Sequence, residues 1–127
     1  MTEEEMIKRG QEMFAKCYGG VIPVPEVTDP KGFPATTLKM FHEHWGDERL
    51  SFREKRFVVL GALAGKGADP ALFGIHAKSA LRNGEMSADE LRGVVHMTIP
   101  YVGYPHASPL FVAVEKLIAE HQKARGS

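Results

Sequence analysis

Apolar residues recur every three or four positions along most of this chain, which is the spacing of helices with one buried face. The first such segment covers residues 3–18, and its small or apolar positions are Met6, Gly10, Met13, Phe14 and Cys17. Gly19-Gly20 can end that helix. A second, shorter helix is predicted from Thr36 to Trp45, with Gly46 at its end.

Residues 21–35 interrupt the helical pattern. They contain four of the eight prolines of the chain, so we expect an extended connection rather than a helix. A connection of this length is unusual in a compact domain. We therefore expect it either to pack on the protein and shape a site or to wrap the surface as a plain arm.

The most apolar stretch of the chain is Phe57 to Ala64. It lies within a helix predicted over residues 52–66, whose start is marked by the capping box Ser51-Phe-Arg-Glu54. Because this helix is apolar on nearly all sides, we predict that it is the central, buried helix of the fold.

Three more helices are predicted in the second half of the chain. Asp69-Pro70 combines an N-cap with proline at the first helical position, and that helix runs to about Asn83, before Gly84. The capping box Ser87-Ala-Asp-Glu90 begins the next helix, which Pro100 kinks or ends. The last helix starts between Pro105 and Ser108. No segment alternates with period two, so we predict an all-α, six-helix single domain over residues 1–127.

Composition narrows the possible functions. The 127 residues are 43% hydrophobic, and 16 basic side chains balance 16 acidic ones, which disfavours nucleic-acid binding and electrostatic membrane binding. Cys17 is the only cysteine, so an intrachain disulfide and a CxxC pair are excluded. We expect a cytoplasmic protein, since the sequence has no secretory signal pattern and no apolar run of membrane-spanning length.

Histidines are the main candidates for chemistry. His42 and His44 are two residues apart and face different sides of a helix, and no zinc-binding spacing occurs, so we predict no metal site. His76 shares a helix face with Leu72 and Ala80, which makes it a candidate general acid or base. A hydrogen-bonded core histidine is the alternative. Tyr101 and His106 lie in a turn between helices that either contributes to a pocket or is only rich in aromatic residues.

Three segments, in order along the chain, resemble the carboxymuconolactone decarboxylase family. Trp45-Gly46-Asp47 with Leu50–Lys55 is similar to the family's tryptophan-glycine stretch and its L-S-x-R-E entry to the central helix. Residues 76–91 resemble its H-x-x-x-A-x-x-x-G-x-[TS]-x-x-E-[LI] core. Residues 101–107 are close to its Y-x-G-x-P-x-A signature. With Arg9-Gly10 near the start, the resemblance covers nearly the whole chain.

The resemblance implies an all-helical homo-oligomer, a hexamer or a trimer, with active sites near subunit interfaces. The family includes cofactor-free decarboxylases of aromatic catabolism and thiol peroxidases of the alkyl hydroperoxidase D-like branch. The peroxidases carry a C-x-x-C pair before the histidine that corresponds to His76, where this chain has Asp69 and Leu72. They also carry a glutamate early in the central helix, where the nearest residues here are Arg56 and Phe57. Thiol peroxidase activity is therefore not expected.

From these observations we predict a cofactor-independent lyase that acts on a small lactone or β-keto carboxylate, with His76 as general acid/base. Its expected substrate-binding residues are Arg53, Arg56, Tyr101, His42, Trp45 and His106. Two alternatives remain: a non-catalytic oligomeric small-molecule binding or scaffold protein, and a hydro-lyase, isomerase or cyclase of a biosynthetic pathway. The first is motivated by residues 68–75, which are apolar where the decarboxylases are more charged.

Two properties of His76 follow if it is the functional histidine. Apolar neighbours would remove water from the imidazole, so its pKa should lie below the free value unless a carboxylate is close. We also expect His76 to line an apolar pocket that the turn from Tyr101 to His106 helps to close.

Overall fold

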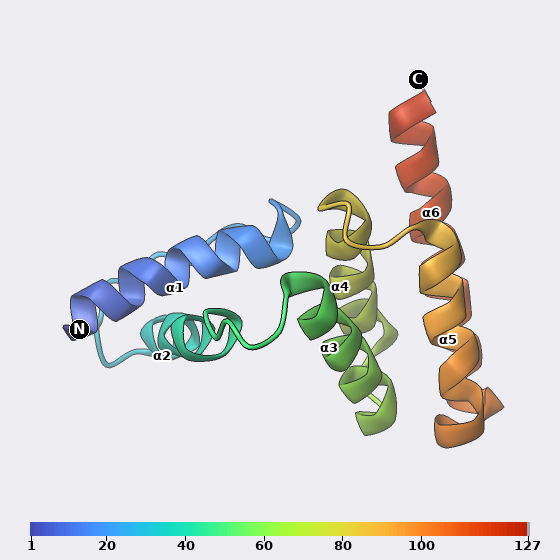
Figure 1. Cartoon of the computed structure of the whole chain (residues 1–127), viewed down its shortest axis with the longest axis horizontal. Coiled ribbons are helices and arrows are strands. Elements are labelled where there is room, and N and C mark those ends of the chain that lie inside the picture. The colour runs from blue at the N-terminus through green and yellow to red at the C-terminus, as the bar shows by residue number, and fades with distance from the viewer. Residues whose placement is uncertain (127) are drawn as a thin grey trace. The chain divides into compact units, whose positions relative to one another are not determined.

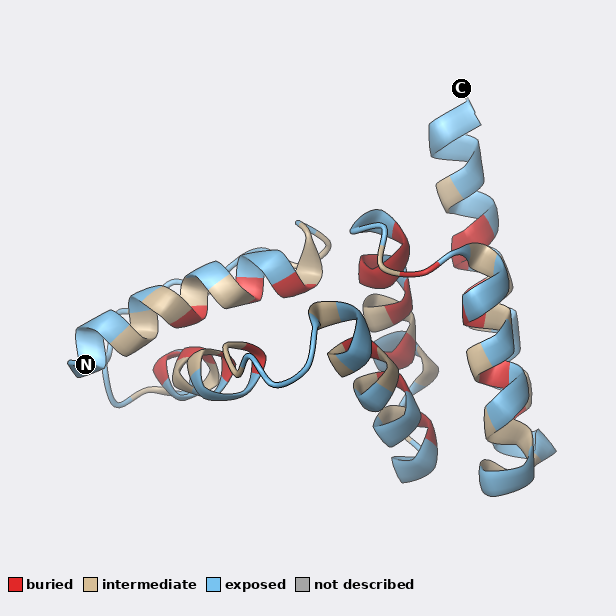
Figure 2. Cartoon of the chain, viewed as in Figure 1, coloured by how far each residue is buried: buried red, intermediate tan, exposed pale blue. Residues whose placement is uncertain are grey.

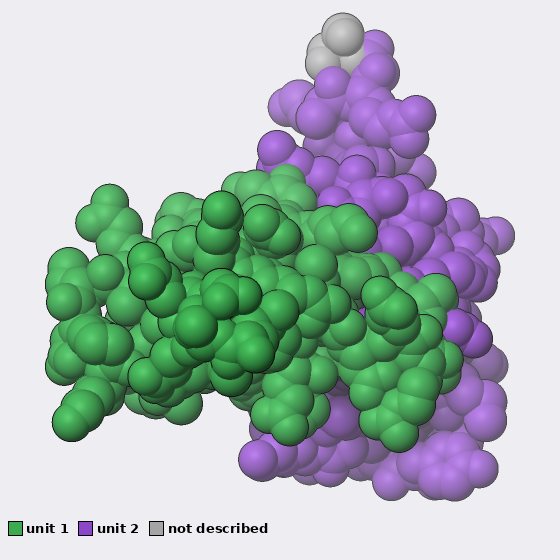
Figure 3. All heavy atoms as spheres, turned by 60° about the vertical axis from the view of Figure 1, so that its left-hand side comes forward, with its two compact units in different colours: residues 1–52 green, residues 53–127 purple. Residues whose placement is uncertain are grey.

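The computed structural model describes residues 1–126, which form six α-helices and one π-helix and contain no strand (Figure 1). The predicted all-α fold class is therefore confirmed. The elements are α1 (Glu3–Tyr18), α2 (Phe33–Met40), η1 (Phe41–Trp45), α3 (Phe52–Lys66), α4 (Pro70–Arg82), α5 (Ala88–Val102) and α6 (Tyr104–Gly126). They group into two compact units, divided after Phe52 and coloured separately in Figure 3. That residues 1–127 act as one domain stays a prediction.

The first unit is built on the crossing of α1 and α2. Gly10 lies at the crossing, and a Cβ atom there would overlap the carbonyl oxygen of Leu38. The two helices approach this closely only because residue 10 has no side chain. Rings from α1, η1 and the start of α3 then form a continuous aromatic cluster, with neighbouring centroids 4.7–6.2 Å apart: Phe14, Tyr18, Phe41, Trp45 and Phe52.

The second helix differs from the one predicted over Thr36–Trp45. It begins three residues earlier, at Phe33, because Pro34 occupies the first helical turn, where its missing N–H breaks no hydrogen bond. After Met40 the backbone continues as the π-helix η1, and the Gly46 N–H donates to the Phe41 carbonyl, five residues back, at 3.0 Å. Gly46 ends this segment as predicted.

The second unit has its core between α3, α4, α5 and α6 (Figure 2). Phe73 and Ala77 of α4 pack in one cluster with Leu91 of α5 and Val114 of α6, and all four are buried. The capping box at Ser87 and the asparagine-glycine end of α4 are present as predicted. Pro100 does not end α5, which continues to Val102; Gly103, with φ of 86°, makes the turn into α6.

Residues 52–66 form the predicted helix, but the prediction that it is the central, buried helix is wrong for the single chain. In α3 only Arg56, Leu60 and Ala64 are buried, at four-residue spacing on one face. Val58, on another face, is 60% exposed. The reason is geometric, because the other helices of this unit cover only one side of α3, and its remaining apolar surface faces outward.

Candidate functional site

The candidate site is centred on an arginine that the fold buries completely. Arg56 occupies the first position of the buried face of α3, and its side chain is 0% exposed. A guanidinium keeps its charge at any physiological pH, so burying it requires an anion and several hydrogen-bond acceptors nearby. The structure provides both from α4 and the turn that follows it.

Glu85 is the anion that neutralises Arg56. Nε of Arg56 donates to Oε1 of Glu85 at 2.8 Å, and Nη2 donates to Oε2 at 3.1 Å, which is the two-bond fork that arginine forms with carboxylates. Asn83 also donates to Oε2, at 3.2 Å. The Glu85 side chain is only 9% exposed, so this is a buried ion pair with well-matched geometry.

The local sequence after α4 explains how Glu85 reaches this position. Gly84 has a φ of 70°, in the left-handed region that favours glycine. The Gly84 N–H donates to the Leu81 carbonyl and the Glu85 N–H to the Ala80 carbonyl. This pair of bonds is a Schellman motif, which turns the chain back over the last helical turn. Glu85 is therefore held against its own helix rather than left in a loop.

His76, on α4, contacts the same guanidinium. Its Nδ1 atom lies 2.9 Å from Nη1 of Arg56. Arginine has only donors, so Nδ1 must accept this hydrogen bond and the neutral ring must carry its hydrogen on Nε2. Burial, followed by the positive charge of Arg56, lowers the pKa of His76 from its ordinary 6.5 to about 4. The predicted direction is confirmed, and the imidazole is neutral at pH 7.

Arg53 forms the neighbouring, more exposed ion pair. Its guanidinium binds the Glu90 carboxylate and lies 4.9 Å from the centre of the Phe57 ring. Hydrogen bonds from Arg53, and then from the backbone of Ser87, lower the pKa of Glu90 to about 2. Arg53 thus joins α3 to the start of α5, and its predicted role in substrate binding stays a prediction.

Tyr101 and His106 border different cavities. They are the two ends of the turn that was predicted to close a pocket. Tyr101 is 80% exposed and borders a groove of about 620 Å³ between α3 and α5, together with Phe57 and Met97. His106 borders a smaller cavity of about 180 Å³ beside Asp69. The expectation that this turn closes a pocket over His76 stays a prediction.

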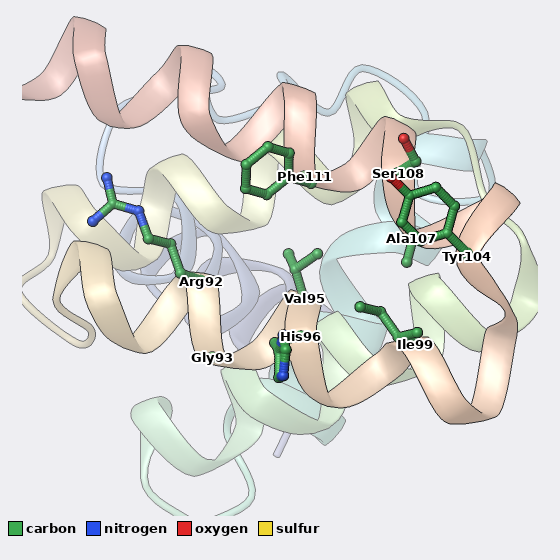
Figure 4. A pocket seen from close by; sticks show the side chains of 9 residues that line it. All are labelled: Arg92, Gly93, Val95, His96, Ile99, Tyr104, Ala107, Ser108 and Phe111. Carbon is green, nitrogen blue, oxygen red and sulfur yellow. The ribbon is translucent and has the colours of Figure 1, made fainter.

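A second apolar groove, of about 500 Å³, runs between α5 and α6 (Figure 4). Val95 and Ile99 of α5 and Phe111 of α6 provide its apolar lining. Arg92 borders it and is held by Glu115 at 2.8 Å and by Asp89 at 3.1 Å. Gly93 lines both this groove and the one on the α3 side, so α5 has an open apolar groove on each flank.

His42 and Trp45 belong to the first unit. Arg9 of α1 donates to the carbonyl oxygens of His42 at 3.1 Å and of Gly46 at 3.0 Å, and its Nη1 lies 3.2 Å from Nδ1 of His42. Trp45 is buried and stacks on Phe41. Both residues therefore have structural partners that hold η1 in place, and their predicted part in binding stays a prediction.

The sequence left the partner of His76 open. It indicated His76 and Arg56 but not Glu85, which occupies a variable position of the resembling segment, directly after Gly84. One signal was present: an arginine at the start of an otherwise apolar helix face needs a buried carboxylate partner. Among residues 1–126, no group of three or more histidine, cysteine or acidic side chains is placed to hold a metal ion.

Fold and site together define a small all-helical protein whose second unit holds a buried polar cluster of Arg56, Glu85 and His76. The comparison with known families agrees with the all-helical fold. The model of the carboxymuconolactone decarboxylase family matches residues 30–116, which is more than half of the chain, so this protein belongs to that family. Decarboxylase-like and alkyl hydroperoxidase D-like proteins are both members, so membership defines the class and not the reaction. No curated protein and no solved structure matches the chain. None of the helices in residues 1–126 is long and apolar enough to cross a membrane.

Proposed function

We propose that this protein is a cofactor-independent lyase of the decarboxylase-like branch, which removes CO2 from a small lactone or β-keto carboxylate with His76 as its acid–base group. The observation that supports this most is the contact between Arg56 and Nδ1 of His76, 2.9 Å long. This contact keeps the imidazole neutral, with its N–H on Nε2, while Glu85 neutralises the charge of Arg56.

The proposed reaction needs only groups that such a site holds. The bond between the carboxylate carbon and the adjacent carbon breaks, CO2 leaves, and the electron pair moves into the neighbouring carbonyl to give an enolate. The enolate oxygen takes the proton on Nε2 of His76, and the ring regains a proton from water, so a carboxylate and a proton become CO2 and the enol form of the decarboxylated product. A hydrogen-bond donor placed at the enolate oxygen lowers the barrier. A neutral imidazole can serve in this way when its surroundings suppress the charged form.

Thiol peroxidase chemistry is the less favoured reaction of the family. It requires two thiols that exchange with each other, and this chain has Asp69 and Leu72 where the pair would stand. Asp69 instead caps α4, accepting from the Ala71 N–H at 2.8 Å. Cys17, in the first unit, is completely buried. These residues support a reaction without redox chemistry.

We further propose that the protein works as a homo-oligomer, a trimer or a hexamer. Several large apolar side chains on three helices are exposed in the single chain: Val58, Met97, Tyr101, Phe111 and Val112. Clusters of exposed apolar residues on this scale are typical of interaction surfaces.

The alternative function, a non-catalytic small-molecule binding or scaffold protein of the same fold, makes a different prediction. In a screen of lactone acids and β-keto acids, we expect at least one compound to release CO2 in the presence of the protein. The same compound should also raise the melting temperature of the protein when this is measured before much of the compound has been converted. Compounds that raise the melting temperature without any release of CO2 would support the binding protein and contradict the lyase.

A further inference from the structure

We propose that Glu85 is a positioning residue: through Arg56 it keeps Nδ1 of His76 as an acceptor, so that the working hydrogen of the ring stays on Nε2. The catalytic consequence of this inference rests on the proposed function. Its structural part is measurable without any substrate.

Arg56 has one stable orientation. Two of its nitrogens are bound to the two oxygens of Glu85, at 2.8 Å and 3.1 Å, and its side chain is fully buried. The fork fixes the plane of the guanidinium, since both bonds form only when guanidinium and carboxylate are nearly coplanar. Nη1 is then directed at His76, at 2.9 Å.

Glu85 is itself fixed by the backbone. The Schellman motif at Gly84 holds its N–H on the Ala80 carbonyl at 2.9 Å, and the Asn83 amide binds Oε2. Glu85 and His76 are both attached to α4, and Arg56 bridges them from α3. The position of the imidazole is thus tied to a helix end nine residues further along the chain.

The orientation of Arg56 limits the chemistry that the His76 ring can perform. While Arg56 donates to Nδ1, the tautomer with a hydrogen on Nδ1 and a basic Nε2 is excluded. A ring of this kind donates from Nε2 to an oxygen that becomes negative, and it does not remove a proton from carbon. A site with this ring therefore suits substrates that form an enolate by losing CO2. It does not suit substrates that must first be deprotonated at carbon, as in an isomerase.

The test is nitrogen NMR of the full-length protein labelled with ¹⁵N-histidine. In the wild type at pH 7, we expect His76 to show an unprotonated Nδ1 and a protonated Nε2, with widely separated resonances. In Glu85→Gln the carboxylate charge is lost. In Glu85→Asp the charge remains, which protects the fold, but the shorter side chain no longer completes the fork. In both variants we expect the two resonances to move toward each other, which is the signature of tautomer exchange.

The matched control is Glu90→Gln, which removes the equivalent charge from the neighbouring Arg53 pair and keeps a residue suited to the capping box. We expect it to leave the His76 resonances unchanged. A wild-type ring protonated on Nδ1, or Glu85→Asp and Glu85→Gln spectra identical to the wild type, would overturn the inference, as would an equal change in Glu90→Gln. If the spectra behave as expected but no carboxylate releases CO2, the proposed function fails and the positioning role stands.

Discussion

At the scale of single residues, the main feature of the site is the positive charge of Arg56 beside His76. The resemblance places a glutamate of the peroxidase branch at or next to the position of Arg56. A carboxylate there would favour the imidazolium, whereas the guanidinium disfavours it and, after burial, lowers the pKa of His76 to about 4. An arginine in place of a glutamate beside the histidine is better suited to a site that polarises an oxygen than to a site that activates a thiol.

The two arginine–glutamate pairs of α3 should differ in their contribution to stability. Arg56→Met leaves Glu85 as an uncompensated buried charge, so we expect it to lower the free energy of unfolding by about 3–5 kcal/mol. Arg53→Met breaks a pair whose side chains are 44% and 41% exposed, so solvent screens it and we expect a much smaller loss. Urea unfolding at pH 7 measures both. Equal losses would show that the burial of Arg56 has no energetic consequence.

The lowered pKa of His76 also predicts how stability depends on pH. The unfolded chain binds a proton at His76 near pH 6.5, whereas the folded chain does so only near pH 4. The contribution of the neutral ring is therefore complete above pH 6.5 and is lost as the pH falls to 4, by about 3 kcal/mol. Urea unfolding of the wild type and His76→Gln between pH 7 and 4 isolates this effect. Parallel curves for the two proteins would contradict the assignment.

At the scale of elements, the chain's local capping chemistry predicted most helix boundaries. The starts of α4 and α5 were found because a cap residue and its partner lie within four positions of each other, as in Ser87 and Glu90. The ends of α1 and α4 were found because a glycine follows each of them. The burial of α3 was not found, because it depends on which neighbours cover the helix. The pair Arg56–Glu85 was missed for the same reason, since 29 residues separate its partners and no local pattern encodes it.

The crossing of α1 and α2 gives a prediction about one glycine. Gly10→Ala places a methyl group against the backbone of Leu38, so the helices must move apart. We expect the free energy of unfolding to fall by about 1–3 kcal/mol, the usual cost of overpacking. Glu12→Ala, an exposed change on the same helix, should stay within about 0.5 kcal/mol of the wild type. Thermal or urea unfolding distinguishes the two, and an unchanged Gly10→Ala protein would contradict this close approach.

At the scale of the whole molecule, α3, α5 and α6 carry many exposed residues (Figure 2). Large apolar side chains such as Val58, Met97 and Phe111 are among them, and an assembly would cover these side chains. We expect light scattering at micromolar concentration to show a trimer or a hexamer. Val58→Glu and Met97→Glu place charges on exposed apolar positions of α3 and α5 and should shift the mass toward smaller species. Val24→Glu, the same change in the extended segment, is the control. A stable wild-type monomer would contradict the proposed assembly.

The proposed lyase reaction depends on His76 more than on any other residue. The most direct measurement is therefore the rate of CO2 release by the wild type and by His76→Gln, on the best substrate from the screen. Glutamine can still accept from Arg56 but cannot act as a neutral imidazole donor or move a proton. We predict a rate lower by about 100-fold or more, with the oligomer and the melting temperature at pH 7 nearly unchanged. A fully active His76→Gln protein would contradict the account, and so would one that fails to fold, because His76 would then be a structural residue of α4.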